Sequence, residues 1–258
     1  MKIETITAAN PRFDVVPAPR YETFDKAADS AAVKYGKRLR KPLNRWLERF
    51  SLMPVGPVLD AAEVPGISIL RDNWEVIRDE ARAVLAERGS VPAFAKISPD
   101  HRRIAPTAAW KSFFFRGYGY DAPAGRAKCP KTAALIDRVP GVVVAFFSVF
   151  EPGTEVPRHH GVTKAMLNVH LGLMVPGDER VCGIRVAGQD HGWKEGEFFV
   201  FDETNDHSAW NRGQTARVVL FLQVRRPMRW PGRMAGSLFL NAVKRTSYVQ
   251  DARKAIGA

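Results

Sequence analysis

The sequence predicts a mainly β protein with flanking helices: a compact barrel or jelly roll of antiparallel strands preceded by a helical N-terminal region. Two patterns predict this fold class. Apolar residues recur at helical spacing in roughly the first hundred residues, whereas short apolar runs separated by turn residues fill the chain beyond residue 108. The length of 258 residues and the hydrophobic share of 45% are those of an ordinary globular protein with a sizeable core.

Residues 1–107 are predicted to form a helical region that packs on the barrel. A first helix, rich in basic residues, is expected over about residues 21–50. Its apolar side holds Trp46, Leu47 and Phe50. A second helix is expected from Asn73, which can cap it, to Arg88, and Gly89 can end it. Its apolar residues at helical spacing are Trp74, Ile77, Ala81 and Leu85.

Residues 108–228 are predicted to form the barrel itself. The expected strands lie in WKSFFFRGYG, VVVAFFSVF, AMLNVHLGLMV, CGIRVAG, GEFFVFDE and ARVVLFLQV. Turn residues separate them, including Pro152-Gly153, Pro176-Gly177-Asp178 and Asn211-Arg212-Gly213. Short strands alternating with turns form an all-β pattern that is typical of a jelly roll.

Residues 229–258 form a basic tail whose apolar residues fit one face of an amphipathic helix. These apolar residues are Leu238, Phe239, Ala242, Val243 and Tyr248. Surface helices usually bury such a face against the core, so packing on the barrel is the favoured interpretation. Binding at a membrane interface is the alternative.

The formal net charge is +12, and the basic excess lies near the two ends of the chain. The early group is Lys34, Lys37, Arg38, Arg40, Lys41, Arg45 and Arg49, and the late group is Arg225, Arg226, Arg229, Arg233, Lys244, Arg245, Arg253 and Lys254. Such a charge favours an anionic membrane surface, an acidic substrate or nucleic acid as partner. The absence of a helix-turn-helix, zinc-finger or RNP signature argues against nucleic acid as the partner.

The cysteine content and the hydropathy predict a cytoplasmic protein. Cys129 and Cys182 form no CxxC pair, which favours reduced thiols over a disulfide framework or a cysteine zinc site. The first residues, MKIETITAANPRF, have no apolar signal core, and the longest apolar run, Val142–Phe150, is about half a membrane span. The basic ends leave open a peripheral contact with the inner face of the membrane.

Two histidines from separate expected strands suggest a metal site. His159 follows a strand and a Pro-Gly turn, so it can face Ser148 across neighbouring strands. His207 comes shortly after the strand that ends at Asp202, and Arg217 opens the next strand. Imidazole suits iron(II), and a guanidinium grips a carboxylate through paired hydrogen bonds. This set of residues therefore suits an iron site that also binds a dicarboxylate.

The remaining histidines are weaker candidates on sequence alone. His170 shares one strand face with Asn168 and Met166, where a lone histidine is usually structural. His191 is expected in a turn, and His101 lies outside the chemistry-bearing segments.

Six segments occur in a specific order and spacing: FFSVFEPGTEVPRHHG, LNVHLGLMVP, CGIRVAG, WKEGEFFVFDET, DHSAWN and RVVLFLQVRRP. Together they resemble the catalytic domain of aspartyl/asparaginyl β-hydroxylases over about residues 108–228. Weaker similarity extends to Trp110-Lys111-Ser112-Phe113 and Cys129-Pro130-Lys131-Thr132.

The resemblance implies a double-stranded β-helix, a cupin-like jelly roll, that holds iron(II) through His159 and His207 and uses 2-oxoglutarate as co-substrate. Ser148, His170 and Arg217 fall on positions that contact 2-oxoglutarate in this family, with Arg217 on its distal carboxylate. The implied reaction is a hydroxylation, in which O2 oxidises 2-oxoglutarate to succinate and carbon dioxide and a hydroxyl group enters an unactivated C–H bond.

Three positions qualify the implied site. Most two-histidine iron sites add a carboxylate where this chain has Gly161, but the resembled family also lacks it and uses water there. His160 is the rival metal ligand, although in an extended strand it would point away from the side of His159. Asn168 stands where animal members have an arginine, so this 2-oxoglutarate-binding position offers a hydrogen-bond donor without charge. Functional and structural roles are both open for Asp202, Trp193 and Arg185.

The substrate stays open between an aspartyl or asparaginyl side chain and a lipid acyl chain, because the resembled family includes bacterial lipid hydroxylases. The alternative class is a non-catalytic cupin-like binding protein whose basic surface meets an anionic membrane or nucleic acid. The presence together of His159, His207 and Arg217 argues against that class. A zinc hydrolase is disfavoured, because the sequence has no HExxH or comparable ligand spacing.

Overall fold

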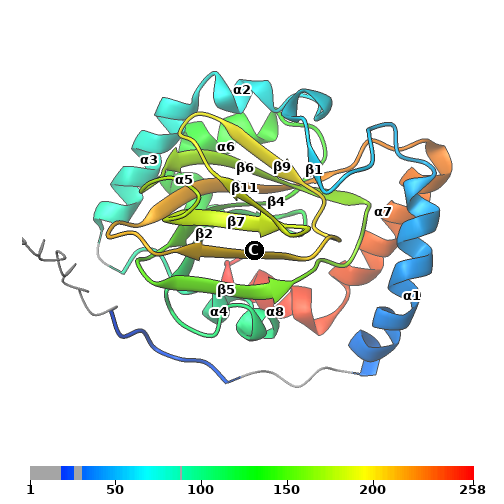
Figure 1. Ribbon diagram of the computed structural model, residues 1–258, viewed down its shortest axis with the longest axis horizontal. Coiled ribbons are helices and arrows are strands. Elements are labelled where there is room, and N and C mark those ends of the chain that lie inside the picture. The colour runs from blue at the N-terminus through cyan, green and yellow to red at the C-terminus, as the bar shows by residue number, and fades with distance from the viewer. Residues whose placement is uncertain (1–18, 26–30, 88) are drawn as a thin grey trace, which may run out of the picture.

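Two antiparallel sheets face each other, with helices outside them (Figure 1). The structure, a computed structural model, describes residues 19–25, 31–87 and 89–258. The larger sheet has the order β1 (Val58–Leu59), β9 (Phe198–Phe201), β6 (Met166–Met174), β11 (Arg217–Arg225), β4 (Val142–Phe150), β2 (Trp110–Gly117) and β3 (Tyr120–Asp121). The smaller sheet has the order β5 (Thr154–His159), β10 (His207–Asn211), β7 (Cys182–Val186) and β8 (Gln189–Gly192). The predicted double-stranded β-helix is confirmed.

The central strands of the larger sheet are covered on both faces, which is why most of their residues are apolar. Strand alternation divides their side chains between two cores. Leu171 and Leu220 face the helical layer, in a core shared with Ile77. Phe146 and Val219 face the smaller sheet, in a core shared with its strands. The polar residues of the candidate site lie on this inner side.

Helices cover the outside of the barrel. They are α1 (Ala31–Glu48), α2 (Ser68–Arg71), α3 (Trp74–Ala86), α4 (Phe94–Ile97), α5 (Pro123–Lys128), α6 (Pro130–Asp137), α7 (Trp230–Lys244) and α8 (Ser247–Ala255), with 3₁₀ turns η1 (Ala61–Glu63) and η2 (Pro99–Arg103). Helices α2, α3 and α6 lie against the larger sheet, and α1 and α7 pack together at the other end of the molecule (Figure 1).

Several expected local features are wrong. The first helix does not begin near residue 21, because residues 19–25 lie outside any helix and Thr23 forms an isolated bridge with Thr107. Asn73 does not cap α3 with its side chain, which instead donates to the carbonyl of Ile69. His191 lies in strand β8 and not in a turn. Helices α5 and α6 interrupt the segment that was expected to be all β.

The N-terminal region contributes to the barrel as well as packing on it. Strand β1 pairs with β9 at the edge of the larger sheet. The domain boundaries at residues 107 and 228 stay predictions. In the basic and apolar sets named above, the side chains of Lys34, Lys37, Arg38 and Tyr248 lie outside the described part of the structure.

Candidate active site

His159 and His207 face each other across paired strands. They are opposed in the β5–β10 register, and their ring centroids are 4.1 Å apart. The Nδ1 of His159 lies 2.8 Å from the carbonyl oxygen of Pro157, and the Nδ1 of His207 lies 2.9 Å from that of Asn205. A carbonyl oxygen can only accept, so each Nδ1 carries the proton and each Nε2 keeps a free lone pair. Both rings are therefore oriented and protonated as metal ligands require.

The surroundings of these histidines keep them uncharged. Burial, with a smaller contribution from the charge of His207, lowers the pKa of His159 to about 3. Burial also lowers the pKa of His207. A neutral imidazole is the form that binds a metal ion, so the site needs little proton release to load one at neutral pH.

His160, the rival ligand, has both ring nitrogens engaged. Its Nδ1 lies 3.0 Å from Oδ1 of Asp206, and its Nε2 is contacted by the guanidinium of Arg40. A metal ion would have to displace one of these partners. The geometry thus favours His159, whose Nε2 has no such partner among the described residues.

Gly161 cannot be replaced by a carboxylate ligand without rearrangement. A Cβ atom at this position would collide with the side chain of Glu203, which fills the adjacent space. Among the described residues, no group of three or more His, Cys, Asp or Glu side chains is arranged to hold a metal ion. The two histidines therefore offer a two-point protein site that leaves the remaining positions to water or a small ligand.

Arg217 is a buried cation without a carboxylate partner among the described residues. Its side chain is 1% exposed, and its guanidinium lies over the rings of Phe150 and Trp193, at 3.5 and 4.4 Å from their centroids. Nη1 donates to the carbonyl and hydroxyl oxygens of Ser148 at 3.2 and 3.4 Å, while the buried Nε has no partner in the described structure. Burial lowers the pKa of Arg217 to about 10, which still leaves it charged at neutral pH.

An unpaired buried charge is costly, so this arrangement points to an anionic ligand that completes it. Cys182 does not supply the missing charge, because burial raises the pKa of its thiol. Ser148 also accepts a hydrogen bond from the indole Nε1 of Trp110, at 3.1 Å. The serine hydroxyl is thereby fixed between an indole and a guanidinium, with its own proton left to donate.

His170 links the arginine to the histidine pair. Its Nδ1 accepts a hydrogen bond of 3.1 Å from Nε1 of Trp193, so the proton of the neutral ring is on Nε2. That Nε2 is buried and unpartnered among the described residues. The ring of Phe201 lies between, with centroids 5.3 Å from His170 and 5.1 Å from His207. The interior of the barrel thus carries two unused donors, on Arg217 and His170, beside the two candidate ligands.

Asn168 is engaged elsewhere. Its Oδ1 accepts a hydrogen bond of 3.1 Å from Nε2 of Gln223, and that Gln223 nitrogen also donates to Oε2 of Glu203 at 2.7 Å. Burial raises the pKa of Glu203 to about 7. The contact of Asn168 with 2-oxoglutarate stays a prediction, and the observed contacts make Asn168 part of a polar cluster beside Gly161.

A pocket of about 460 Å³ opens beside His159 and is lined mainly by basic residues. It is lined by Arg40, Arg103, Arg158, His159, His160 and Asp206. Arg158 forms an ion pair with Asp206, the only acidic lining residue, whereas Arg103 forms no ion pair with any described residue. Burial and the charge of Arg103 lower the pKa of Arg40. The two arginines therefore form a positive rim that an anionic group can neutralise.

The sequence matches the Aspartyl/Asparaginyl beta-hydroxylase family over residues 71–227, more than half of the chain. The chain belongs to this family of hydroxylases. It is 32% identical over 252 residues to the ornithine lipid ester-linked acyl 2-hydroxylase of Rhizobium tropici, covering 95% of this chain and 89% of that protein. It is 28% identical over 170 residues to human aspartyl/asparaginyl beta-hydroxylase, covering 64% of this chain but only 22% of that protein. A solved prolyl-4-hydroxylase from Pseudomonas putida aligns with 61% of this chain and 88% of its own, at a TM-score of 0.38 and 19% identity.

The structure shows the surroundings of the three residues whose roles the sequence left open. Trp193 donates to His170 and stacks on Arg217, and its functional role stays a prediction. Arg185 is a surface residue, since it forms an ion pair with Asp190 at the exposed side of β7. Asp202 is fully buried and belongs to a polar network that the sequence did not reveal.

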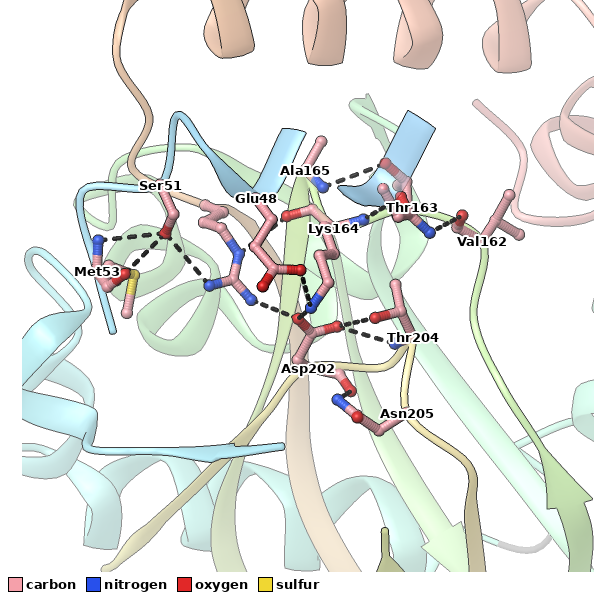
Figure 2. A network of polar contacts seen from close by, with 12 residues as sticks. Glu48, Ser51, Met53, Val162, Thr163, Lys164, Ala165, Asp202, Thr204 and Asn205 are labelled. Carbon is pink, nitrogen blue, oxygen red and sulfur yellow. Dashed lines mark hydrogen bonds and ion pairs between the residues drawn. The ribbon is translucent and has the colours of Figure 1, made fainter. Parts of the chain in front are cut away.

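That network fixes the two segments that carry the metal-ligand candidates (Figure 2). Asp202 binds Nη2 of Arg226 at 2.7 Å and Nζ of Lys164 at 2.9 Å, and it accepts from the amide and hydroxyl of Thr204. Arg226 also donates to the main-chain carbonyl of Lys164. The side-chain oxygen of Asn44, on α1, accepts a hydrogen bond from the main-chain N–H of Lys164. The segment after His159 and the segment before His207 are thus tied together through one buried carboxylate.

Sequence reasoning missed Glu203, Arg40 and Arg103 as residues of the site. Glu203 had a local signal, since it directly follows the strand that ends at Phe201-Asp202. For Arg40 and Arg103 the only signal in the sequence was their positive charge. Both belong to the N-terminal region and come to line the pocket through contacts that are distant in sequence.

Proposed function

We propose that this protein is an iron(II)- and 2-oxoglutarate-dependent hydroxylase that acts at position 2 of an acyl chain ester-linked in an ornithine-type lipid. The observation that carries the co-substrate is the buried guanidinium of Arg217, which lacks a carboxylate partner among the described residues. Guanidinium binds carboxylates through a planar pair of hydrogen bonds, and the unpaired Nε matches that need.

The protein groups fit iron(II) and 2-oxoglutarate together. His159 and His207 would hold the metal through Nε2. Arg217 and Ser148 would hold the distal carboxylate of 2-oxoglutarate. The Nε2 proton of His170 would be available to the opposite end of the 2-oxoglutarate molecule. When bound, iron(II) with 2-oxoglutarate and O2 supplies the oxidising chemistry for an unactivated C–H bond. The aromatic rings of Phe150 and Trp193 exclude water from the guanidinium and so strengthen its interaction with a carboxylate.

The lipid substrate is supported by the extent of similarity. The relative named for acyl 2-hydroxylation matches along 95% of this chain, whereas the human relative named for aspartyl and asparaginyl residues matches along 64%. Position 2 of an acyl chain is the carbon next to the ester carbonyl, so the polar part of such a lipid must lie close to the metal. The ornithine carboxylate then has a cationic neighbour in the rim formed by Arg40 and Arg103.

Succinate formation tests the proposed function. Anaerobically purified protein is loaded with iron(II) and 2-oxoglutarate, mixed with O2 and an ornithine lipid, and compared with His207→Ala and Arg217→Gln. We expect both variants to lose substrate-dependent succinate and the hydroxylated lipid detected by mass spectrometry. Arg185→Gln, which removes a surface arginine, should retain full turnover.

The same assay addresses the alternatives. Turnover with an aspartyl- or asparaginyl-containing peptide and none with lipid would replace the lipid by a peptide substrate. If the protein neither binds iron(II) nor 2-oxoglutarate and produces no succinate with either substrate, it is a non-catalytic cupin-like binding protein.

A further inference from the structure

Helix α7 presents two glycines to the protein and three large apolar residues to solvent. A Cβ added to Gly232 would lie 2.6 Å from Cβ of Phe50, and one added to Gly236 would lie 2.9 Å from Cβ of Ala165. These glycines therefore let the helix pack closely on the molecule. On the opposite side, Trp230, Met234 and Leu238 are 64%, 46% and 65% exposed. Their spacing of four residues aligns them along one face.

This outcome differs from the expected packing of the tail. Phe239 packs against the inner core, but Leu238 and Ala242, assigned to the same buried face on sequence, are exposed. Helix α3 shows the ordinary arrangement for comparison, since its Ile77 and Ala81 are fully buried. An outward apolar stripe on α7 thus calls for a partner that accepts large apolar side chains.

Unpaired arginines flank this stripe. Arg229 and Arg233 are exposed at the start of α7, and Arg45 on the neighbouring helix α1 and Arg49 just after that helix are exposed too. None of the four side chains forms an ion pair or hydrogen bond with any residue in the described ranges. On α3, by contrast, Arg82 is paired with Asp79. The α7 face therefore combines apolar side chains with uncompensated positive charge.

We propose that the face formed by Trp230, Met234 and Leu238, with Arg229 and Arg233, docks on a bilayer surface that contains anionic lipids. Such a helix lies in the interface plane, with its apolar side chains in the acyl boundary and its arginines at the head groups. A second copy of this chain is a poorer occupant, because a symmetric contact would bring the same arginines together. No helix in the described part of the chain is long and apolar enough to cross a membrane.

Helix α1 connects the docking face on α7 to the active site. Arg40, which lines the pocket beside His159, is on α1, and Trp46 follows on the same helix with 38% exposure. Helix α1 packs against α7 through Leu43, Leu47 and Ala235. Docking through α7 would place the basic pocket near the surface from which a lipid head group is presented, although the docking surface does not depend on the proposed reaction.

Vesicle flotation tests the docking surface with the full chain. Vesicles of phosphatidylcholine with a quarter phosphatidylglycerol are compared with vesicles of phosphatidylcholine alone, for wild type, for W230S/M234S/L238S and for R229Q/R233Q. We expect wild type to float with the anionic vesicles and the triple variant to bind at least about tenfold more weakly. The arginine variant should lose about 25-fold on the anionic vesicles, at about fivefold per charge, and little on the neutral ones.

Matched controls separate this surface from general effects. Val76→Ser removes an exposed apolar side chain on α3, and R82Q/R185Q removes two exposed arginines outside α1 and α7; both variants should bind as wild type. Succinate formation with a detergent-solubilised lipid should be unchanged in W230S/M234S/L238S, which separates docking from the reaction. Failure of wild type to bind anionic vesicles, equal binding by the triple variant, or a wild-type dimer that this variant converts to monomer would each overturn the proposal.

Discussion

His159 and His207 occupy directly paired positions of β5 and β10, and each Nδ1 faces a main-chain carbonyl two residues before it. Neighbouring His160, in contrast, is tied to Asp206 and Arg40. One residue of sequence thus separates an imidazole free to bind a metal from one held in a surface ion-pair cluster.

Metal binding should distinguish the two adjacent histidines. His159→Ala removes one of the two candidate ligands and should abolish measurable iron(II) or cobalt(II) binding in anaerobic titration calorimetry. His160→Ala removes a ring whose nitrogens are already occupied and should retain metal affinity within a few-fold. The assignment of ligands is wrong if His160→Ala loses the metal and His159→Ala keeps it.

Asp202 should stabilise the protein far more than an exposed carboxylate does. Asp202→Ala leaves Arg226 buried without its partner, and removing one member of a buried pair costs about 3–5 kcal/mol. Urea unfolding followed by circular dichroism measures this loss. Asp190→Ala, which removes the partner of surface Arg185, serves as the control and should leave the midpoint unchanged. Equal effects of the two substitutions would contradict the role assigned to the buried network.

Alternation along the strands made much of the barrel predictable. The runs 142–150 and 217–225 are mostly apolar because both of their faces are covered, and they form β4 and β11. The same alternation correctly placed Arg217 on one face with Val219 and Phe221. Local pattern did not predict α5 and α6, because helices of 6 and 8 residues are too short to show a clear helical period.

Local pattern and family resemblance predicted which residues form the candidate site, but not the contacts that their side chains make. The histidines and Arg217 stand in recognisable segments, but the state of each side chain depends on contacts between distant segments. Trp193 reaches His170 across 23 positions, and Arg40 reaches His160 across 120. Nothing in the neighbouring sequence of Arg40 marks that contact. The environment of each of these side chains is therefore a property of the fold.

Glu203 should make stability fall as the pH rises through neutrality. Burial raises the pKa of Glu203 to about 7 from an ordinary 4.5, so between these values the folded protein keeps a proton that the unfolded chain has lost. The stabilisation is complete below about pH 4.5 and is lost as the pH passes through 7. Glu203→Gln stays neutral, so its unfolding free energy relative to wild type should increase by up to about 3 kcal/mol between pH 5 and pH 8.

Paired urea titrations of wild type and Glu203→Gln at pH 5, 6, 7 and 8 measure this difference directly. The comparison cancels the titration of the histidines, which are common to both proteins. A difference that stays constant across the range would mean that Glu203 is ionised in the folded protein throughout, stabilised by the amide of Gln223.

Arg103 should discriminate substrates by the charge of their head group. It lies at the rim of the pocket with no ion-pair partner among the described residues, and its charge acts on neighbouring Arg40. Arg103→Gln should therefore raise the KM for an ornithine lipid by about tenfold, as expected for losing a hydrogen bond to a charged group, while kcat changes little. With the methyl ester of the same lipid, which lacks the carboxylate, wild type and variant should have the same KM. Arg212→Gln, whose arginine is paired with Glu155 on the surface, should match wild type on both lipids. An equal rise in KM for the acid and the ester would show that Arg103 acts on the shape of the pocket and not on the substrate charge.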